Sequence, residues 1–318
     1  MGLTVGVDIG GTKIAAGVVD EDGTIVETET EATPATDPDA LSDAVAACVQ
    51  RLRERHEVEA VGIGAAGFVD VDRSTILFAP NIDWDDEPLG SHVHKRVGLP
   101  VVVENDANAA AWGEFRFGAG KDVDDLLLIT VGTGIGGGLV ARGELFRGSY
   151  GLAFEVGHMR VVPAGLLCGC GRYGCWEQYA SGTALVRDAR DRMHSELPEA
   201  RPLAEHVQND SSAITGPMVT ELAKAGDPLC QDLLADAGVW LGEGIASLIA
   251  VLDTSVVAIG GGVAAAGDLL LEPATAAFIR TLPAATHRKN AELRLATLGN
   301  RAGMIGAADL ARTPGAAR

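Results

Sequence analysis

Short apolar runs alternate along the chain with amphipathic or alanine-rich stretches, and several of the apolar runs end in glycine or in polar residues. The run at 100–103 ends in three polar residues, Glu104, Asn105 and Asp106. An alanine-rich segment follows, so the pattern predicts a short buried strand and then a helix over 107–115. Open α/β sheets place their ligands at strand ends of this kind. The junction is therefore a candidate site.

The same alternation predicts the remaining elements. Helical spacing of apolar residues predicts helices at 40–56, 176–194, 229–252, 268–281 and 299–310. Buried strands are predicted at 60–67, 255–259 and 293–297, and the last helix is expected to pack on the first lobe. The segment 79–84 is expected to be a loop, and 196–215 is polar, loop-rich and without chemistry that we can assign.

A strand, a glycine turn and a second strand are predicted over 4–19. Its tip carries Asp8, Gly10, Gly11, Thr12 and Lys13. Backbone N–H groups of such a tip can face an anion, the lysine adds a cation, and the aspartate is a possible partner for a hydrated metal. Taken alone, the segment is more typical of an ordinary tight turn.

The segment 125–140 has the same form, with a buried strand, the tip residues Gly132, Thr133 and Gly134, and another strand. Two such units about 120 residues apart predict a duplicated two-lobed α/β architecture that grips one phosphate chain. A third glycine cluster, at 260–262, could lie against a base or ribose. None of the clusters has the GxGxxG arrangement of dinucleotide-binding folds, and the Walker A pattern is missing.

Asp106 and Asn81 each have two interpretations. A carboxylate at a strand end can accept a proton from a substrate hydroxyl, but it can also serve only as a helix N-cap. Three polar groups at a junction where one cap would suffice favour the functional interpretation. Asn81 could contact a substrate through its amide, although a solvent-facing turn residue is the more ordinary reading.

Four metal-ligand side chains follow within a short span: His158, Cys168, Cys170 and Cys175. One imidazole and three thiolates suit a tetrahedral, closed and therefore structural zinc ion. A redox thiol group and solvated loop cysteines are the alternatives. Glu155 and Glu177 flank this cluster, either as positioned groups or as surface glutamates. The other cysteines, Cys48 and Cys230, are expected to be core thiols.

Composition limits the functions that are possible. The 318 residues are 47% hydrophobic and 22% charged, which is ordinary for a globular protein of two domains. The net charge of −19 argues against sequence-independent binding to nucleic acid or to anionic membranes. No signal segment and no uninterrupted run of about 18 apolar residues is visible, so a cytoplasmic protein is expected.

Taken together and in order, these motifs resemble the ROK family of sugar kinases and repressors, and within it the actinobacterial-type ATP-dependent glucokinases. The resemblance covers nearly the whole chain. It rests on 8–13, 104–108, 132–138, the pair Glu155 and His158, the cysteine cluster running into Glu177, the glycines at 260–262 and the ending at 299–308.

The resemblance implies an actin-like, ribonuclease H-like α/β fold with two lobes and a central cleft. It implies a small lobe of 1–118 plus 299–313, and a large lobe of 119–298 that holds the zinc loop, the adenosine site and the oligomer interface. A homodimer or homotetramer is also implied. A repressor would carry a DNA-binding domain ahead of Asp8, and the start of this sequence leaves no room for one.

The resemblance also implies roles for individual residues. Asp106 would be the general base that transfers the γ-phosphoryl of ATP to the 6-hydroxyl of glucose, with Mg²⁺ as cofactor. Sugar contacts would come from Gly67, Asn81, Asn105, Asp106, Glu155, His158 and Glu177. Nucleotide contacts would come from Asp8, Gly10, Gly11, Thr12, Lys13, Thr133, Gly134, Gly261 and Gly262. Other hexoses as acceptors, and polyphosphate as donor, stay open at this point.

Overall fold

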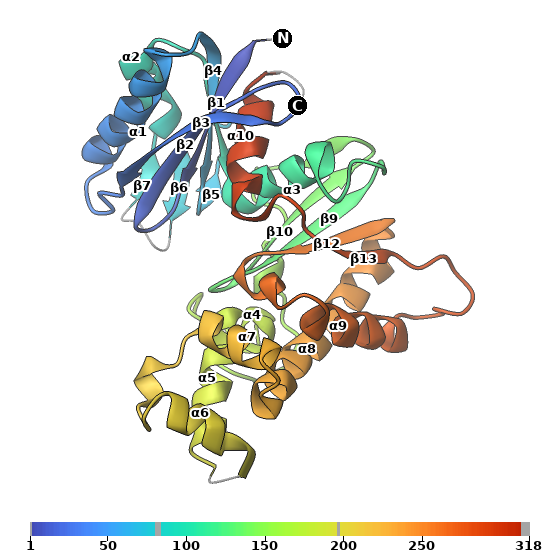
Figure 1. Cartoon of the computed structure of the whole chain (residues 1–318). Coiled ribbons are helices and arrows are strands. Elements are labelled where there is room, and N and C mark those ends of the chain that lie inside the picture. Colours follow the sequence, from blue (N-terminus) through green and yellow to red (C-terminus); the bar gives the residue numbers. More distant parts are fainter. Residues whose placement is uncertain (1, 80–83, 196–197, 313–318) are drawn as a thin grey trace. The chain divides into compact units, whose positions relative to one another are not determined.

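A computed structural model of the chain describes residues 2–79, 84–195 and 198–312 (Figure 1). The chain forms two compact units. The first contains Met1–Leu128, Gly137–Phe154 and Thr297–Arg318, and the second contains Ile129–Gly136 and Glu155–Ala296.

The first unit is built on a five-stranded sheet with the order β3-β2-β1-β4-β8. Its strands are β1 (Leu3–Ile9), β2 (Lys13–Val19), β3 (Ile25–Ala32), β4 (Val58–Ala65) and β8 (Val101–Asn105). β1 pairs antiparallel with β2, as the predicted hairpin requires, and parallel with β4, which pairs parallel with β8. Three strands therefore point their carboxyl ends to one edge of the sheet.

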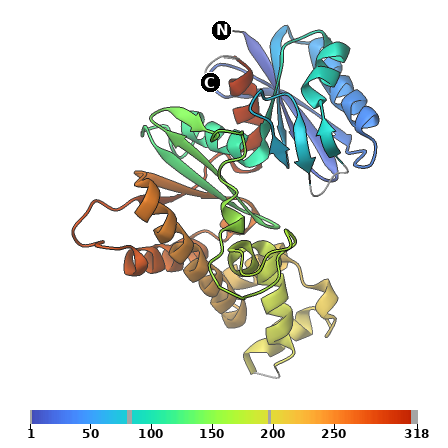
Figure 2. The ribbon, with the colours of Figure 1, turned by 180° about the vertical axis from the view of Figure 1, so that it is seen from behind.

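Helices cover both faces of this sheet (Figures 1 and 2). α1 (Pro38–Arg53) and α2 (Leu89–Val97) pack on one face, where Val5, Val7 and Ile9 are buried in the main core. α10 (Ala302–Arg312) packs on the other face, beside α3 (Asp106–Phe117). The predicted last helix thus lies on the first unit.

α10 approaches the sheet so closely that two strand positions must be glycine. A Cβ atom on Gly6 would lie 1.9 Å from the Met304 carbonyl oxygen, and one on Gly62 would lie 1.8 Å from that of Ala307. Both distances are far below van der Waals contact. The small residues of the helix and the two glycines therefore fix α10 directly against β1 and β4.

A small antiparallel sheet, with the order β5-β6-β7, was not predicted from the sequence. It contains β5 (Phe68–Val69), β6 (Ile76–Ala79) and β7 (Trp84–Glu87). Strands of two to four residues are too short to give a clear alternating pattern, and the loop expected at 79–84 overlaps the ends of two of them. Asn81 lies outside the described residues.

A second five-stranded sheet has the order β11-β10-β9-β12-β13. Its strands are β9 (Leu126–Val131), β10 (Ile135–Ala141), β11 (Glu144–Phe146), β12 (Val256–Gly260) and β13 (Glu292–Leu295). The division between the units passes through β9 and β10. The expected large lobe included all of 119–298, whereas residues 137–154 group with the first unit. A Cβ atom on Gly138 would lie 2.6 Å from that of Ala111, so this part of β10 packs on α3.

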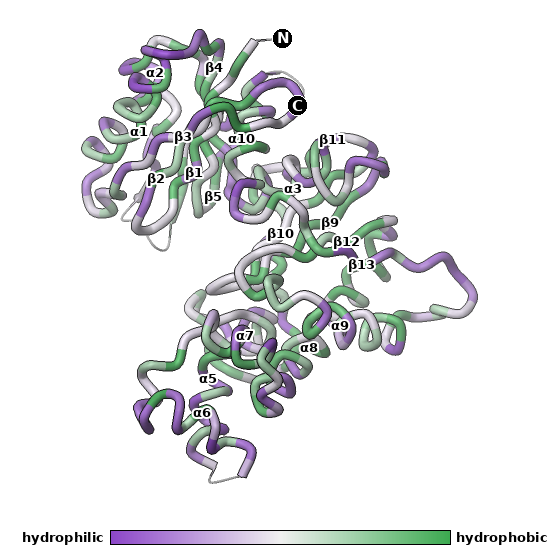
Figure 3. Tube along the Cα trace, viewed as in Figure 1, coloured by the Kyte–Doolittle hydropathy of each residue, from purple (hydrophilic) through white to green (hydrophobic). Residues whose placement is uncertain are grey.

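The second unit is mostly helical. Its α-helices are α4 (Glu177–Ala180), α5 (Gly182–Met193), α6 (Arg201–His206), α7 (Gly216–Lys224), α8 (Pro228–Leu252) and α9 (Asp268–Thr281). Short 3₁₀ helices are η1 (Val156–His158), η2 (Pro198–Ala200), η3 (Ser211–Ala213), η4 (Gly262–Ala266) and, in the first unit, η5 (Gly299–Arg301). Figure 3 shows hydrophilic residues in the connection between α9 and β13.

The single helix predicted over 176–194 is interrupted at one residue. Ser181 has an extended backbone, and its hydroxyl accepts a hydrogen bond of 3.2 Å from the Ala184 N–H. This N-cap starts α5 separately from α4. The break matters for the site because it places the N-terminus of α5 beside the tip of the second hairpin.

α8 resembles a membrane span more closely than the count of consecutive apolar residues indicated. Among the described helices it alone is long and apolar enough to cross a membrane by length and composition. Asp236 and Glu243 interrupt its run of consecutive apolar residues, which is why a simple count missed it. Half of its most apolar window is buried in the protein, and it packs against α9, α7, α5 and α4. Buried core helices satisfy the same test, so the finding is weak evidence for a membrane span.

Candidate active site

The register of the three parallel strands brings the first group of candidate residues to one edge of the sheet. Asp8 pairs with Gly64, which pairs with Glu104, and one position further Ile9 pairs with Ala65, which pairs with Asn105. Asp106 follows at once, and Gly67 follows β4 by two residues. The sequence prediction that the polar junction lies at a strand end of an α/β sheet is therefore confirmed.

The helix N-cap at this junction is Asn105. Its Oδ1 accepts hydrogen bonds from the backbone N–H groups of Ala107, at 3.0 Å, and Asn108, at 3.1 Å. Its Nδ2 donates to the Gly67 carbonyl oxygen at 3.1 Å. Because Asn105 caps α3, Asp106 is not needed for that role. The alternative in which Asp106 serves only as an N-cap does not fit this geometry.

Asp106 is the first residue of α3 and is half-buried. Its Oδ1 accepts the Ala107 N–H at 2.9 Å. Burial raises the pKa of this carboxyl group above its ordinary value, and hydrogen bonds from the backbone lower it in part. A carboxylate that is costly to keep charged is a better proton acceptor than an exposed aspartate.

Asp8 forms a second acidic group at the same edge. Burial, and then the negative charge of Asp106, raise the pKa of Asp8 from 3.8 to about 6. A Cβ atom on Gly303 would lie 3.8 Å from the Asp8 Cγ and 3.9 Å from the Asp106 carbonyl oxygen, so both aspartates adjoin the start of α10. Two neighbouring carboxylates with raised pKa values are suited to share a cation or a proton.

Gly67 needs to be glycine at its position. Its φ is +143°, and a Cβ atom would lie 2.6 Å from the Phe78 carbonyl oxygen. The bond from Asn105 to its carbonyl ties this loop to the start of α3. Gly67, Asn105 and Asp106 are thus brought together within the first unit.

The first hairpin tip is open on its outer side. Gly11, Thr12 and Lys13 are exposed, and a Cβ atom on Gly11 would meet nothing within 4 Å. Gly10 is held from behind, because its N–H donates to the Lys13 carbonyl at 3.0 Å and its carbonyl accepts the Thr33 hydroxyl at 2.7 Å. The tip therefore presents backbone and a lysine side chain to solvent, as an anion site requires.

A cavity of about 690 Å³ lies in the second unit, at the tip of the second hairpin. Its walls come from the tip, from the starts of α5, α7 and η4, and from the exposed side of α5. The lining residues are Gly132, Thr133, Gly182, Thr183, Val186, Arg187, Arg190, Asp191, Thr215, Gly216, Pro217, Thr220, Gly262 and Val263. This size is typical of small-molecule sites, and helix N-termini favour anionic groups.

Only part of this cavity could be identified from the sequence. Thr133 and Gly262 line it, whereas Gly134 and Gly261 do not. Gly261 has φ +85°, and a Cβ atom there would lie 2.5 Å from the Val131 carbonyl oxygen. The α5 and α7 residues were missed. Two helix-start patterns, Gly182-Thr183 and Thr215-Gly216-Pro217, were the available signals.

The predicted metal ligands come together. The ligand atoms of His158, Cys168, Cys170 and Cys175 all lie within 4.8 Å of one another. His158 Nδ1 is 3.6 Å from Cys168 Sγ, and Cys170 Sγ is 3.6 Å from Cys175 Sγ. A tetrahedral ion with Zn–S bonds of about 2.3 Å separates its sulfur ligands by roughly 3.8 Å. The four side chains are compatible with a structural zinc ion.

The two flanking glutamates also belong to the second unit. Glu177 is the first residue of α4, and its Oε1 accepts the Cys168 thiol at 2.9 Å and lies 3.8 Å from His158 Nδ1. Glu155 is exposed and precedes η1. A Cβ atom on Gly157 would lie 2.1 Å from the Ile135 carbonyl oxygen, so η1 is fixed against the second hairpin.

Comparisons with known proteins agree with these features. The ROK family profile matches residues 4–314. A glucokinase of Streptomyces coelicolor is 52% identical over 99% of both chains, and one of Halalkalibacterium halodurans is 39% identical over 95% of this chain and 92% of its own. A crystal structure of a ROK family glucokinase from Streptomyces griseus, in complex with glucose and AMPPNP, is 54% identical.

That structure covers 98% of this chain and 100% of its own, with a TM-score of 0.89. The expected fold class is thereby confirmed as the α/β fold of the actin-like sugar kinases. The family profile extends over nearly all of the described residues, and the strand edge, the two glycine hairpins and the cysteine cluster all occur within it. The chain belongs to the ROK family.

Proposed function

We propose that the chain is an ATP-dependent glucokinase that transfers the γ-phosphoryl group to the 6-hydroxyl of glucose. The observation that carries this proposal is Asp106, which is half-buried at a strand end, has a raised pKa and is not the N-cap of α3. The glucose and AMPPNP bound in the Streptomyces griseus relative support this choice of substrates.

In this proposal Asp106 orients the 6-hydroxyl of the hexose and accepts its proton as the bond to phosphorus forms. The protein's contribution to a loose, in-line transfer is mainly position and charge. Asn105 and Gly67 would contact other hydroxyl groups, as would Asn81, Glu155, His158 and Glu177. His158 directs Nδ1 toward the cysteines, which leaves Nε2 for a sugar hydroxyl.

ATP is proposed to occupy the cavity of the second unit. The adenosine part would lie among the side chains of α5 and α7, and the phosphates would meet Thr133 and the helix N-termini. Gly10 to Lys13 are proposed phosphate contacts, through backbone N–H groups and the lysine side chain. Bound magnesium would neutralise phosphate charge, and Asp8 is the carboxylate suited to hold it, through water.

Zinc is proposed to be structural. Its four ligands come from one short segment and would leave no coordination position for a substrate. The cytoplasmic location and the homo-oligomer implied by the family resemblance belong to the same proposal.

Replacing Asp106 by Asn tests the general base. We expect kcat to fall about 10²- to 10⁴-fold, because the amide cannot accept the hydroxyl proton, while the dissociation constant for glucose changes only a few-fold. A coupled assay of glucose-dependent ADP formation and titration calorimetry measure the two quantities. Asp268→Asn is the matched control, since Asp268 is exposed and likewise the first residue of its helix. Turnover like that of the wild type in Asp106→Asn would refute the assignment.

The raised pKa of Asp8 predicts a pH-dependent stability. The pKa of Asp8 is 3.8 in the unfolded chain and about 6 in the folded protein, so between these pH values the folded state binds more protons than the unfolded state. The free energy of unfolding therefore falls as pH rises and Asp8 ionises. Asp8→Asn removes this loss. In the absence of magnesium, the free energy of unfolding of the Asp8→Asn variant minus that of wild type should increase by on the order of 2–3 kcal/mol from pH 4 to pH 7. Denaturant titrations across that range measure it, and a constant difference would contradict the raised pKa.

The zinc proposal predicts about one zinc ion per chain in protein purified without chelator. Cys175→Ser should lose the ion and lower the melting temperature, because metal binding energy is folding energy. Elemental analysis and thermal denaturation are the measurements. Cys230→Ser, at a buried cysteine outside the cluster, should keep the zinc. Wild-type protein with no zinc would overturn the assignment.

A further inference from the structure

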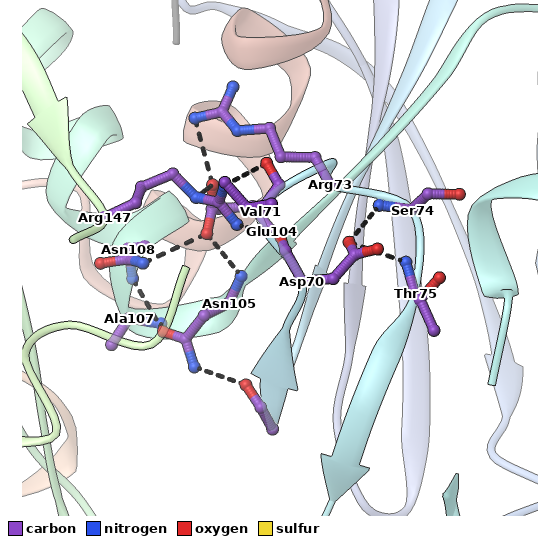
Figure 4. A network of polar contacts seen from close by, with 11 residues as sticks. Asp70, Val71, Arg73, Ser74, Thr75, Glu104, Asn105, Ala107, Asn108 and Arg147 are labelled. Atoms are coloured by element: carbon purple, nitrogen blue, oxygen red, sulfur yellow. Dashed lines mark hydrogen bonds and ion pairs between the residues drawn. The ribbon is translucent and has the colours of Figure 1, made fainter. Parts of the chain in front are cut away.

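A buried carboxylate lies directly before the junction that carries Asp106. Glu104 is 1% exposed, and two guanidinium groups, those of Arg73 and Arg147, approach it (Figure 4). Arg73 Nη2 is 3.1 Å and Arg147 Nε is 2.9 Å from Glu104 Oε2. Both arginines are themselves buried. A charged triad is costly to bury, so its contacts merit a functional explanation.

The other carboxylate oxygen is directed at the start of α3. Glu104 Oε1 accepts the Asn105 N–H at 3.0 Å and the Asn108 Nδ2 at 3.1 Å. It therefore holds the backbone just before Asp106 and a side chain two residues after it. Figure 4 shows these bonds converging on Glu104 from the strand end and from the first turn of the helix. Asp106 lies between two points that one carboxylate fixes.

The arginines connect this carboxylate to two other loops of the first unit. Arg73 belongs to the turn between β5 and β6, and its carbonyl oxygen accepts the Val103 N–H at 2.9 Å. Arg147 follows β11 and donates to the Val71 and Asp70 carbonyl oxygens, at 2.9 and 2.8 Å. Glu104 thus joins the turn, the 147–154 loop and the start of α3.

The charges of the triad do not balance, because two guanidinium groups face one carboxylate. Burial lowers the pKa of Arg73, and Arg147 lowers it further, whereas Glu104 raises it. Glu104 is the only acidic side chain ion-paired to either arginine among the described residues. Removing its charge would leave two like charges buried side by side, which is strongly unfavourable.

We propose that Glu104, held by Arg73 and Arg147, is a positioning residue that sets the geometry of the Asn105–Asp106 junction for phosphoryl transfer. It contacts neither substrate in this account and acts through the backbone N–H of Asn105 and the side chain of Asn108. The inference rests on the proposed function, because it assigns the purpose of the triad to the general base.

Glu104→Gln is the sharpest test. The glutamine can still accept the bonds from Asn105 and Asn108, but its NH₂ group would face two guanidinium donors without a counter-charge. Small displacements of a catalytic group can cost about 10²-fold in rate. We expect kcat with glucose to fall about 10- to 100-fold. The KM for ATP should stay within about two-fold of wild type, because the contacts of Glu104 are to Asn105, Asn108, Arg73 and Arg147 and to none of the residues proposed to bind ATP.

Glu114→Gln is the matched control for general destabilisation. Glu114 is also a fully buried carboxylate, on the helix α3 that begins two residues after Glu104, and accepts backbone N–H groups from Ala119, Thr297 and Leu298 at 2.8, 3.1 and 2.7 Å. Its substitution should lower the melting temperature, as Glu104→Gln should, but leave kcat within about two-fold of wild type. A purely structural role for Glu104 predicts the same kinetics for both variants, which would overturn the proposal.

Arg147→Lys keeps the test decisive if Glu104→Gln does not fold. Lysine retains the positive charge but cannot hold Glu104 and the two carbonyl oxygens together. A folded Arg147→Lys protein should lose kcat several-fold with an unchanged KM for ATP, and an unchanged kcat would contradict the positioning role. Wild-type protein without glucose-dependent turnover would contradict the proposed function. Active wild type with unimpaired variants contradicts the positioning role alone.

Discussion

The parallel pairing of β1, β4 and β8 is the constraint on which the candidate active site depends. Because Asp8, Gly64 and Glu104 are in register, the residues that follow the three strands lie together at one edge of the sheet. A slip of one residue would turn Asp8 and Glu104 to the opposite face of the sheet, into the apolar core under α1. The hydrophobic pattern of these strands therefore also specifies where the acidic groups lie.

Three carboxyl groups that are costly to bury lie at the same edge of the sheet. For Glu104, ion pairs and hydrogen bonds offset that cost. The charge of Glu104 is compensated by two arginines and two hydrogen bonds, whereas burial raises the pKa values of Asp8 and Asp106, and the charge of Asp106 adds to the shift at Asp8. Glycines at the α10 contact remove side chains that would push the helix away. Close packing beneath the edge and carboxyl groups with raised pKa values at the edge are features that suit the proposed site for a cation and a hydroxyl.

Much of this arrangement could be predicted from the sequence. Both glycine hairpins, the strand-to-helix junction at Asp106 and the clustering of His158 with three cysteines follow from local patterns and ligand chemistry. The β5-β6-β7 sheet, the cavity beside α5 and the Glu104 triad could not. Arg73 and Arg147 are 31 and 43 positions from Glu104, and no local pattern pairs residues so distant. The sequence also left open which residue caps α3, because Asp106 could have served as the N-cap in place of Asn105.

The central claim is that Asp106 accepts the proton of the hexose hydroxyl. A crystal structure of the protein with glucose and a non-hydrolysable ATP analogue tests it most directly. The account predicts that the glucose 6-hydroxyl lies within about 2.6–3.2 Å of an Asp106 carboxylate oxygen, on the side opposite the Ala107 N–H bond. Glucose bound with its 6-hydroxyl against another group, and Asp106 outside hydrogen-bonding distance of it, would contradict the account.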